Sequence, residues 1–171
     1  MNYFFKSRGL TLLELLLAIT VVLVLIGLAM PSFIEIIQSH RLRQASESFY
    51  NDLLLARATA IKQQTTVFVV FQSGTNWCYG LNNNSSCSCS VTNNCQLNGT
   101  TKIITSSNFN GVTLNTSNFS GANTAFEGVR GTVSNTGTIT LSNNGKSVSI
   151  IINKMGYIQI CSNTFSGYNP C

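Results

Sequence analysis

One uninterrupted apolar run near the N-terminus limits what this chain can fold into. Residues 10–30 read LTLLELLLAITVVLVLIGLAM and contain one charged residue, Glu14. A helix of about 21 residues rises roughly 31 Å, which is enough to cross the hydrocarbon core of a bilayer. We therefore expect residues 10–30 to form a transmembrane helix that is apolar on every side.

A cleavable secretory signal is the alternative interpretation of this run. Gly27-Leu28-Ala29 resembles the small-residue site at which such signals are cut. The run is longer than the usual apolar core of a signal peptide, which has about 7–15 residues. A signal peptide also leaves the carboxylate of Glu14 unexplained. Both observations favour a retained helix.

Helical periodicity continues beyond Pro31. Pro31 lacks a backbone N–H and is expected to kink the helix. Apolar residues then recur at spacings that mostly fit one helical face: Phe33, Ile37, Ala45, Phe49, Leu53, Ala56 and Ala60. We place the charged residues on the other faces: Glu35, Arg41, Arg43, Glu47, Asp52, Arg57 and Lys62. The predicted helix covers residues 10–62, and its second half is amphipathic.

The pattern changes to that of β-strands after Gln64. Residues 65–71 (TTVFVVF) are β-branched and aromatic, which predicts a buried strand. Further strands are expected at 77–81, 102–105, 111–114, 124–129, 138–141, 147–152 and 157–161. Asn143-Asn144-Gly145 is a hairpin signal because glycine tolerates positive φ. The predicted fold class is α+β: a long N-terminal helix followed by a small antiparallel β-domain over residues 63–171, with a cysteine-bearing loop at 82–100.

All six cysteines follow the apolar run: Cys78, Cys87, Cys89, Cys95, Cys161 and Cys171. An even number of cysteines in a polar domain beyond a membrane segment indicates disulfides in an oxidising compartment. A zinc site is the alternative, but the chain has no Cys-x2-Cys pair and its only histidine, His40, lies far away. We expect Cys161 to pair with Cys171, and the other four cysteines to tie their loop to itself.

The charged residues argue against catalysis and against a strong nucleic-acid surface. Only 9% of the residues are charged, and the cations of the β-domain are scattered rather than clustered. We find no Ser/His/Asp set, carboxylate pair, glycine-rich phosphate loop or metal-binding cluster. The sequence therefore predicts a protein that is not an enzyme and that needs no cofactor and no metal.

The residues at the start of the apolar run resemble a processing signal. Lys6-Ser7-Arg8-Gly9-Leu10-Thr11-Leu12-Leu13-Glu14 is similar to the class III prepilin signal: a short basic leader, a glycine, an apolar residue and a glutamate at the fifth position of the mature chain. The resemblance implies that a prepilin peptidase cuts between Gly9 and Leu10 and methylates Leu10. Residues 1–9 are then a leader peptide, and Pro31 stands where pilins often carry a proline.

Glu14 has a physical reason to be there if the resemblance holds. A carboxylate within an apolar span costs about 2.5–3.5 kcal/mol on insertion scales and therefore needs a partner. In pilin filaments that partner is thought to be the N-terminal amine of a neighbouring subunit, and we expect Glu14 to act in filament assembly. The alternative is that Glu14 lies at the headgroup interface and is hydrated.

Residues at the end of the predicted helix and in the C-terminal part of the chain show which group of pilin-like proteins the chain resembles. Residues 54–62 (LLARATAIK) resemble the helix end of the FimT/FimU/GspH group, and so do Phe126-Glu127-Gly128, residues 137–141 and Gly156-Tyr157-Ile158 further on. This group contains minor pilins of type IV pili and minor pseudopilins of type II secretion systems. The resemblance implies a subunit that is held in the bacterial inner membrane and then primes a periplasmic or surface filament at or near its tip, with other pilins or pseudopilins as partners.

Direct DNA binding is a weaker expectation. In FimT-like proteins a C-terminal Gly-Arg-x-Arg motif is associated with DNA capture, and the matching stretch here is Gly156-Tyr157-Ile158-Gln159, without either arginine. Phosphate contacts need cations. Lys154 is the nearest one, and Tyr157 could stack on bases.

Overall fold

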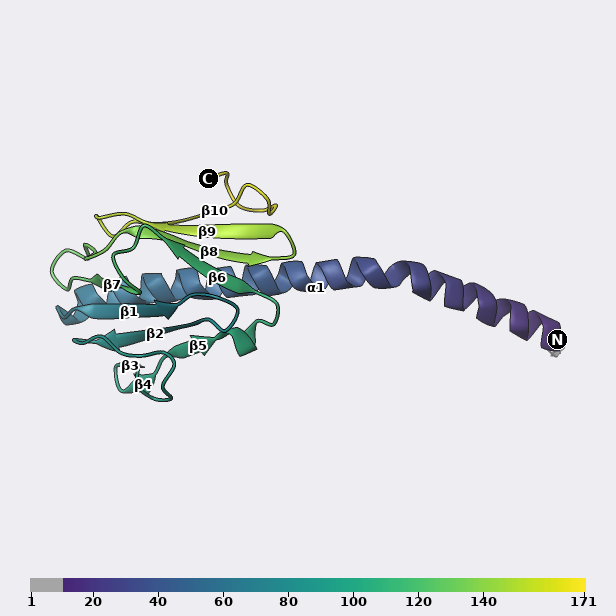
Figure 1. The fold of residues 1–171 in the computed structure, drawn as a ribbon, viewed down its shortest axis with the longest axis horizontal. Coiled ribbons are helices and arrows are strands. Elements are labelled where there is room, and N and C mark those ends of the chain that lie inside the picture. Colours follow the sequence, from purple (N-terminus) through teal and green to yellow (C-terminus); the bar gives the residue numbers. More distant parts are fainter. Residues whose placement is uncertain (1–10) are drawn as a thin grey trace, which may run out of the picture. The chain divides into compact units, whose positions relative to one another are not determined.

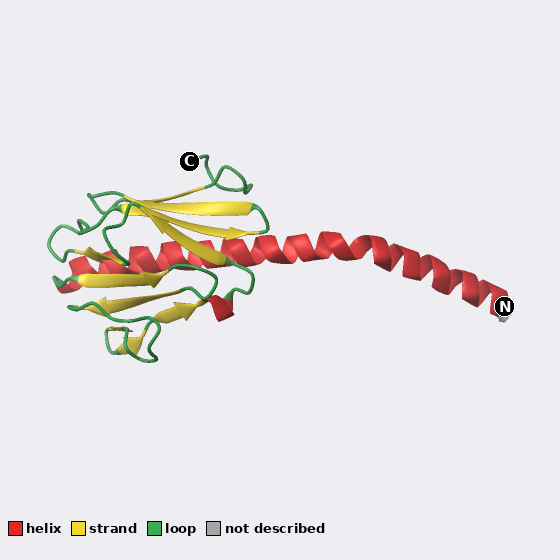
Figure 2. Ribbon diagram, viewed as in Figure 1, coloured by secondary structure: helices red, strands yellow, loops and turns green. Residues whose placement is uncertain are grey.

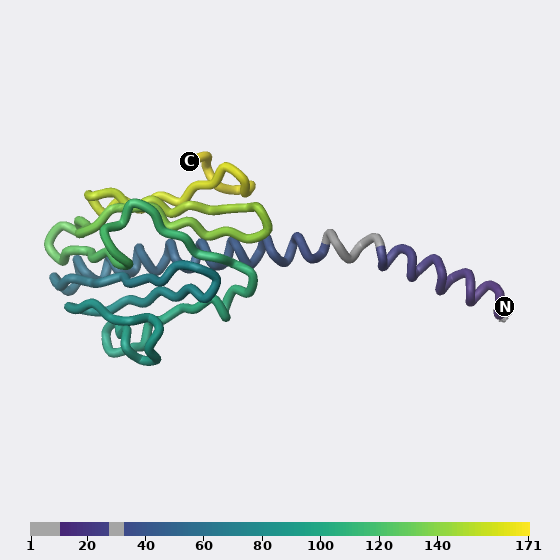
Figure 3. Tube along the Cα trace, in the orientation of Figure 1, coloured from purple at the N-terminus to yellow at the C-terminus, as the bar shows by residue number. Residues whose placement is uncertain are grey.

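The computed structural model describes residues 11–171, except for the side chains of residues 28–32. One helix, α1 (Leu12–Gln63), runs through 52 residues and ends where Gln64 adopts a positive φ of 54° and the β-branched run begins. The chain divides into two compact units, Met1–Ile37 and Gln38–Cys171. The second half of α1 therefore belongs to the same unit as the strands (Figure 3).

The strands form antiparallel sheets beside the second half of α1 (Figures 1 and 2). They are β1 (Val67–Gln72), β2 (Cys78–Asn83), β3 (Gln96–Leu97), β4 (Thr100–Thr101), β5 (Ile103–Thr105), β6 (Thr113–Ser117), β7 (Asn123–Phe126), β8 (Gly137–Asn143), β9 (Lys146–Ile152) and β10 (Ile158–Cys161). One sheet has the order β5-β2-β1-β7 and the other β10-β9-β8-β6, while β3 and β4 pair with each other. This architecture confirms the predicted fold class.

The hairpin predicted around Asn143–Gly145 joins β8 to β9. Asn143 pairs with Lys146, so Asn144 and Gly145 form a two-residue loop. Both loop residues have positive φ, 47° and 76°, as a type I′ turn requires. The right-handed twist of this turn matches that of the strands it connects.

One stripe of α1 packs into the core that both sheets share. Its residues are completely buried: Leu42, Ala45, Phe49, Leu53, Ala56 and Ala60. The cluster is completed by residues from β1, β2, β3, β6, β7, β8, β9 and β10 and from the segments that connect them. The predicted face is thus confirmed from Ala45 to Ala60. Phe33 and Ile37 are 63% and 48% exposed, so the buried stripe of α1 begins at Leu42.

Three disulfides stabilise the β-domain: Cys78–Cys89, Cys87–Cys95 and Cys161–Cys171. The third is the pair expected from the sequence, and the first two tie residues 78–95 to themselves. All six sulfurs are therefore oxidised, so none of them is a thiolate that could ligate zinc.

Two short elements were not predicted. The β3–β4 hairpin lies inside the segment that we expected to be a loop, and η1 (Ser106–Asn108) is a short 3-10 helix after β5. Strands of two residues are too short to give a sequence periodicity.

Candidate functional site

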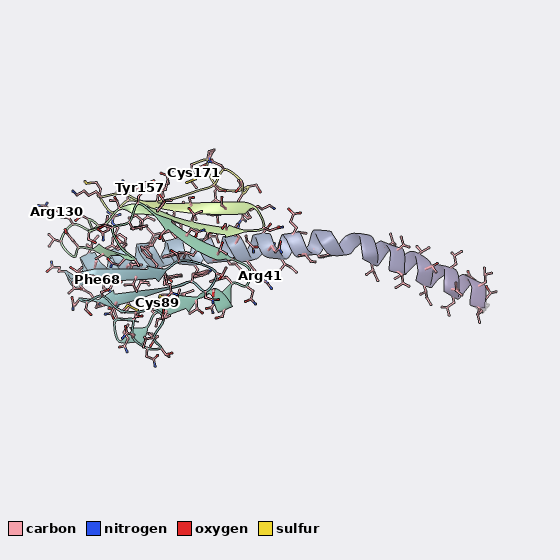
Figure 4. All side chains as sticks on the ribbon, viewed as in Figure 1. Arg41, Phe68, Cys89, Arg130, Tyr157 and Cys171 are labelled. Carbon is pink, nitrogen blue, oxygen red and sulfur yellow. A yellow bond between two sulfur atoms is a disulfide. The ribbon has the colours of Figure 1, made fainter. Side chains whose placement is uncertain are left out.

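The first part of α1 exposes apolar side chains on all its sides. The large ones between Leu12 and Ile26 are each at least half exposed: Leu12, Leu13, Leu15, Leu16, Leu17, Ile19, Val21, Val22, Leu23, Val24, Leu25 and Ile26. Figure 4 shows side chains on both visible sides of this part of the helix. A helix that is apolar all round is stable only in lipid or among other apolar helices.

No helix within the described residues combines the length and the mean hydropathy that a membrane span requires. The predicted span at 10–30 includes Leu10 and residues 28–30, which lie outside the residues or side chains described, and it stays a prediction.

Glu14 lies in the first turn of this apolar segment and is exposed. The backbone N–H of Glu14 donates to the hydroxyl of Thr11, at 3.3 Å. Thr11 thus caps the helix, and Thr-x-x-Glu is the sequence of a capping box. A carboxylate in the first turn is also favoured by the positive end of the helix dipole. The predicted cleavage pair, Gly9 and Leu10, and the kink at Pro31 lie outside the described residues and side chains.

A charged network joins α1 to the segment that follows β4. Asp52 is only 6% exposed, and its Oδ1 lies 2.8 Å from the Nζ of Lys102. The other carboxylate oxygen accepts a hydrogen bond of 2.9 Å from the hydroxyl of Tyr79. We expected Asp52 away from the apolar face, and this was wrong. Its ion pair and hydrogen bond satisfy the charge that burial would otherwise leave isolated.

Tyr79 is the centre of this network. Burial raises the pKa of its phenol well above the usual range, and the nearby carboxylate of Asp52 acts in the same direction. Its ring stacks on Phe49 with centroids 4.0 Å apart, and on Trp77 at 6.2 Å. The indole N–H of Trp77 donates to the carbonyl of Val112, at 2.7 Å. The stack therefore fixes β2 against α1.

The C-terminal disulfide loop packs on the same helix through Arg43. The guanidinium lies 5.5 Å from the ring centre of Phe165 and 5.9 Å from that of Tyr168. Its Nη2 also donates to the carbonyl of Ser166, at 3.3 Å. The hydroxyl of Tyr168 donates to Glu47, at 3.2 Å. Cation–π and hydrogen bonds of this kind hold a loop that has little apolar core of its own.

Alkaline pH should weaken this loop contact. Burial raises the pKa of Tyr168 from 10.0 to about 12, and the carboxylate of Glu47 acts in the same direction. Because the folded pKa is above the unfolded one, this contribution to stability is complete below pH 10 and is lost as pH rises from 10 through about 12. Denaturant unfolding across this range measures it. The loss should be smaller in Tyr168→Phe, which lacks this phenol; an equal loss would contradict the assignment.

The stretch that matches the Gly-Arg-x-Arg motif begins in a tight turn. Gly156 has a φ of +74°, and a Cβ there would overlap the carbonyl oxygen of Gly131 and lie 3.2 Å from the Nε of Arg57. The sequence places Arg57 off the apolar face of α1; its side chain is partly exposed, but this nitrogen is buried. Lys154 and Tyr157 are exposed on either side of the turn. Arg130 is exposed one residue before Gly131 (Figure 4).

Substituting Gly156 with alanine should destabilise the domain more than its conformation alone explains. Gly99 provides a matched control, because its φ is +77° and nothing lies within 4 Å of its would-be Cβ. Alanine in a left-handed conformation costs about 1–2 kcal/mol at either position. Overlap with Gly131 should add about 1–3 kcal/mol at position 156. Thermal unfolding of the two variants measures the difference, and equal losses would contradict the close contact.

Residues 45–156 match the model of the family described as type II transport protein GspH, which is more than half of the 171-residue chain. The minor pseudopilin EpsH from the type 2 secretion system of Vibrio cholerae superposes with a TM-score of 0.55 at 16% identity, covering 71% of this chain and 97% of that one. The type IV minor pilin FimU of Pseudomonas aeruginosa gives 0.53 at 18% identity, with 71% and 88% covered. No curated protein matches by sequence. At these identities, the structural likeness establishes a common fold.

Proposed function

Because the chain belongs to the GspH family, we propose that it is a non-catalytic minor subunit of a type IV pilin-like filament. The observation that carries this proposal is the first part of α1. Large apolar side chains are exposed there on every side, and Glu14 is the only charged residue from Leu12 to Phe33. Neither water nor the fold of the β-domain satisfies such a surface. Lipid before assembly, and the helices of neighbouring subunits after it, would both do so.

The pathway we propose begins in the bacterial inner membrane. A prepilin peptidase removes residues 1–9 and methylates Leu10, and the subunit then joins other pilins or pseudopilins at or near the tip of the filament. Glu14 pairs with the terminal amine of a neighbour. Two observations support this order of events: the resemblance of Lys6–Glu14 to a prepilin signal and the match to the GspH family.

Of the two filament systems, we propose the type IV pilus, where the subunit serves assembly and adhesion or DNA uptake. The supporting observation is the disulfide-linked segment 78–95, which forms a large, polar addition on the β-domain. The second candidate is a minor pseudopilin of a type II secretion system, which the family description favours. Direct DNA capture by this subunit is not part of the proposal, because Tyr157 and Gln159 stand where the FimT motif has its two arginines.

Deletion of the gene separates the two candidates. A minor pilin predicts loss of surface pili, twitching and transformation, with export of enzymes unchanged. If the protein is a minor pseudopilin, deletion should abolish export of enzymes and leave surface pili, twitching and transformation unchanged. Complementation with the full chain is the control. If none of these properties changes in the deletion strain, the filament proposal is wrong.

A further inference from the structure

The β-domain carries an uncharged groove to which neither the family nor the filament proposal gives a role. Two adjacent hollows, with volumes of ≈ 570 and ≈ 400 Å³, lie beside the Cys78–Cys89 disulfide. Gln72, Cys89 and Ser90 line both hollows and therefore lie where the two hollows adjoin. The larger volume is in the range of small-molecule sites. We refer to the two hollows together as the groove. Because they share three lining residues, they are adjacent, and this suits an elongated ligand of linked units.

The chemistry of the groove is neutral. Among the described residues that line either hollow, none is charged. Between Lys62 and Glu127 the sequence has a single charged residue, Lys102, and its ammonium group is 2.8 Å from Asp52. Phosphates, nucleic acids and acidic peptides all require cations that this surface does not offer. The lining thus selects against charged ligands.

What the lining does offer is hydroxyl and amide groups together with a larger share of apolar surface. Asn76 and Thr92 are exposed, and neither side chain makes a hydrogen bond within the described part of the chain. Amide and hydroxyl groups both donate and accept hydrogen bonds, as sugar hydroxyls do. Ile103 and the Cys78–Cys89 disulfide supply apolar surface for the C–H face of a sugar ring.

The groove is also held in shape before any ligand arrives. The disulfides Cys78–Cys89 and Cys87–Cys95 fix its loop. The hydroxyl of Ser90 donates to the Oε1 of Gln72 at 2.6 Å, and this hydrogen bond holds the two residues together where the hollows adjoin. The hydroxyl of Thr101 donates to Asn93 at 3.0 Å on the wall of the larger hollow. A preformed site loses less conformational entropy when it binds.

We propose that this groove binds a neutral oligosaccharide. Gln72, which lines both hollows, contacts the ligand where it passes from one hollow to the other. The proposal goes beyond the filament role and does not depend on it, because all the residues involved belong to the β-domain. A peptide that adds to the edge strand β5 is the competing occupant, and the test below treats it as an outcome.

The test uses the full chain in detergent micelles. It is applied to an array of neutral oligosaccharides (maltotriose, cellotriose, chitotriose and N-acetyllactosamine) and to the acidic trigalacturonate. We expect at least one neutral glycan to bind with a Kd below about 1 mM, and trigalacturonate not to bind. Binding of none of the neutral glycans, or equal binding of trigalacturonate, would overturn the proposal. So would binding of unstructured peptides in their place.

Two pairs of variants place the binding in the groove. Thr92→Trp fills the larger hollow and should abolish binding, whereas Thr100→Trp, on β4 in the same region but outside the lining, should not change it. Gln72→Ala should weaken binding at least tenfold, and Gln159→Ala, exposed on β10, should not. Unfolding midpoints and intact disulfides confirm the fold of each variant. If Thr92→Trp does not fold, Gln72→Ala decides; unchanged affinity in a folded groove variant contradicts the proposal.

Discussion

Replacing Glu14 with glutamine is expected to remove the protein from filaments and to leave its amount in the membrane unchanged. Glu14 is the only charged residue in a segment whose apolar side chains are all exposed. Once neighbouring helices cover that segment, the carboxylate loses water and needs a cation. Glutamine keeps the size of the side chain and removes the charge. If the pair with a terminal amine contributes about 2 kcal/mol, its loss lowers incorporation by more than tenfold.

Two control variants distinguish pairing from helix capping and from a general effect of charge. Thr11→Ala removes the hydroxyl that accepts from the N–H of Glu14, which costs about 1 kcal/mol of helix stability, but it keeps the carboxylate. Glu127→Gln makes the same charge change on the β-domain. Both should still enter filaments. Immunoblots of sheared filaments and of membranes measure how much of each variant is in filaments and how much is in the membrane. Wild-type incorporation of Glu14→Gln would rule out the pairing role.

Replacing Asp52 with alanine should strongly destabilise the unit that the second half of α1 forms with the strands. The substitution leaves Lys102 without the carboxylate at 2.8 Å and the hydroxyl of Tyr79 without its acceptor. Removing one member of a buried ion pair costs about 3–5 kcal/mol. Since the side chain of Lys102 is 32% exposed and can be partly rehydrated, we expect about 2–3 kcal/mol. The melting temperature should then fall by roughly 10 °C.

A double-mutant cycle shows whether the ion pair is the cause. Lys102→Met removes the charge that Asp52→Ala strands, so the double variant should be more stable than the sum of the single losses predicts. Thermal unfolding of the four proteins gives the coupling energy. Glu47→Ala, which removes a carboxylate that is 53% exposed on the same helix, should cost less than about 1 kcal/mol. Additive losses would show that packing around Asp52, rather than its charge, is responsible.

Local patterns in the sequence were enough to predict most of the fold. The 3.6-residue spacing from Ala45 to Ala60 identified the buried stripe of α1, and the β-branched run at 65–71 identified the central strand β1. The Asn-Asn-Gly signal located the β8–β9 hairpin because its turn demands positive φ at two residues. Each of these features is determined by residues close together in the chain.

Features that depend on distant partners could not be predicted in this way. Asp52 was placed away from the apolar face because periodicity does not reveal Lys102, 50 positions further on, as its partner. The burial of the Nε of Arg57 could not be predicted for a similar reason, because Gly131 and Gly156 come close to it only in the folded domain. Phe33 and Ile37 continue the helical pattern, but a pattern does not show where the packed domain begins. The groove beside Cys89 likewise combines segments that give no common sequence signal.

The central claim is that this chain is processed and assembled as a pilin-like subunit, and the mass of its N-terminus tests it most directly. The protein is extracted from membranes of strains with and without the prepilin peptidase and analysed intact and after proteolysis. We predict a mature chain that begins at methylated Leu10, and an uncut precursor when the peptidase is absent. A chain that begins at Met30 in both strains would mean a secreted β-domain without its apolar helix and would contradict the account.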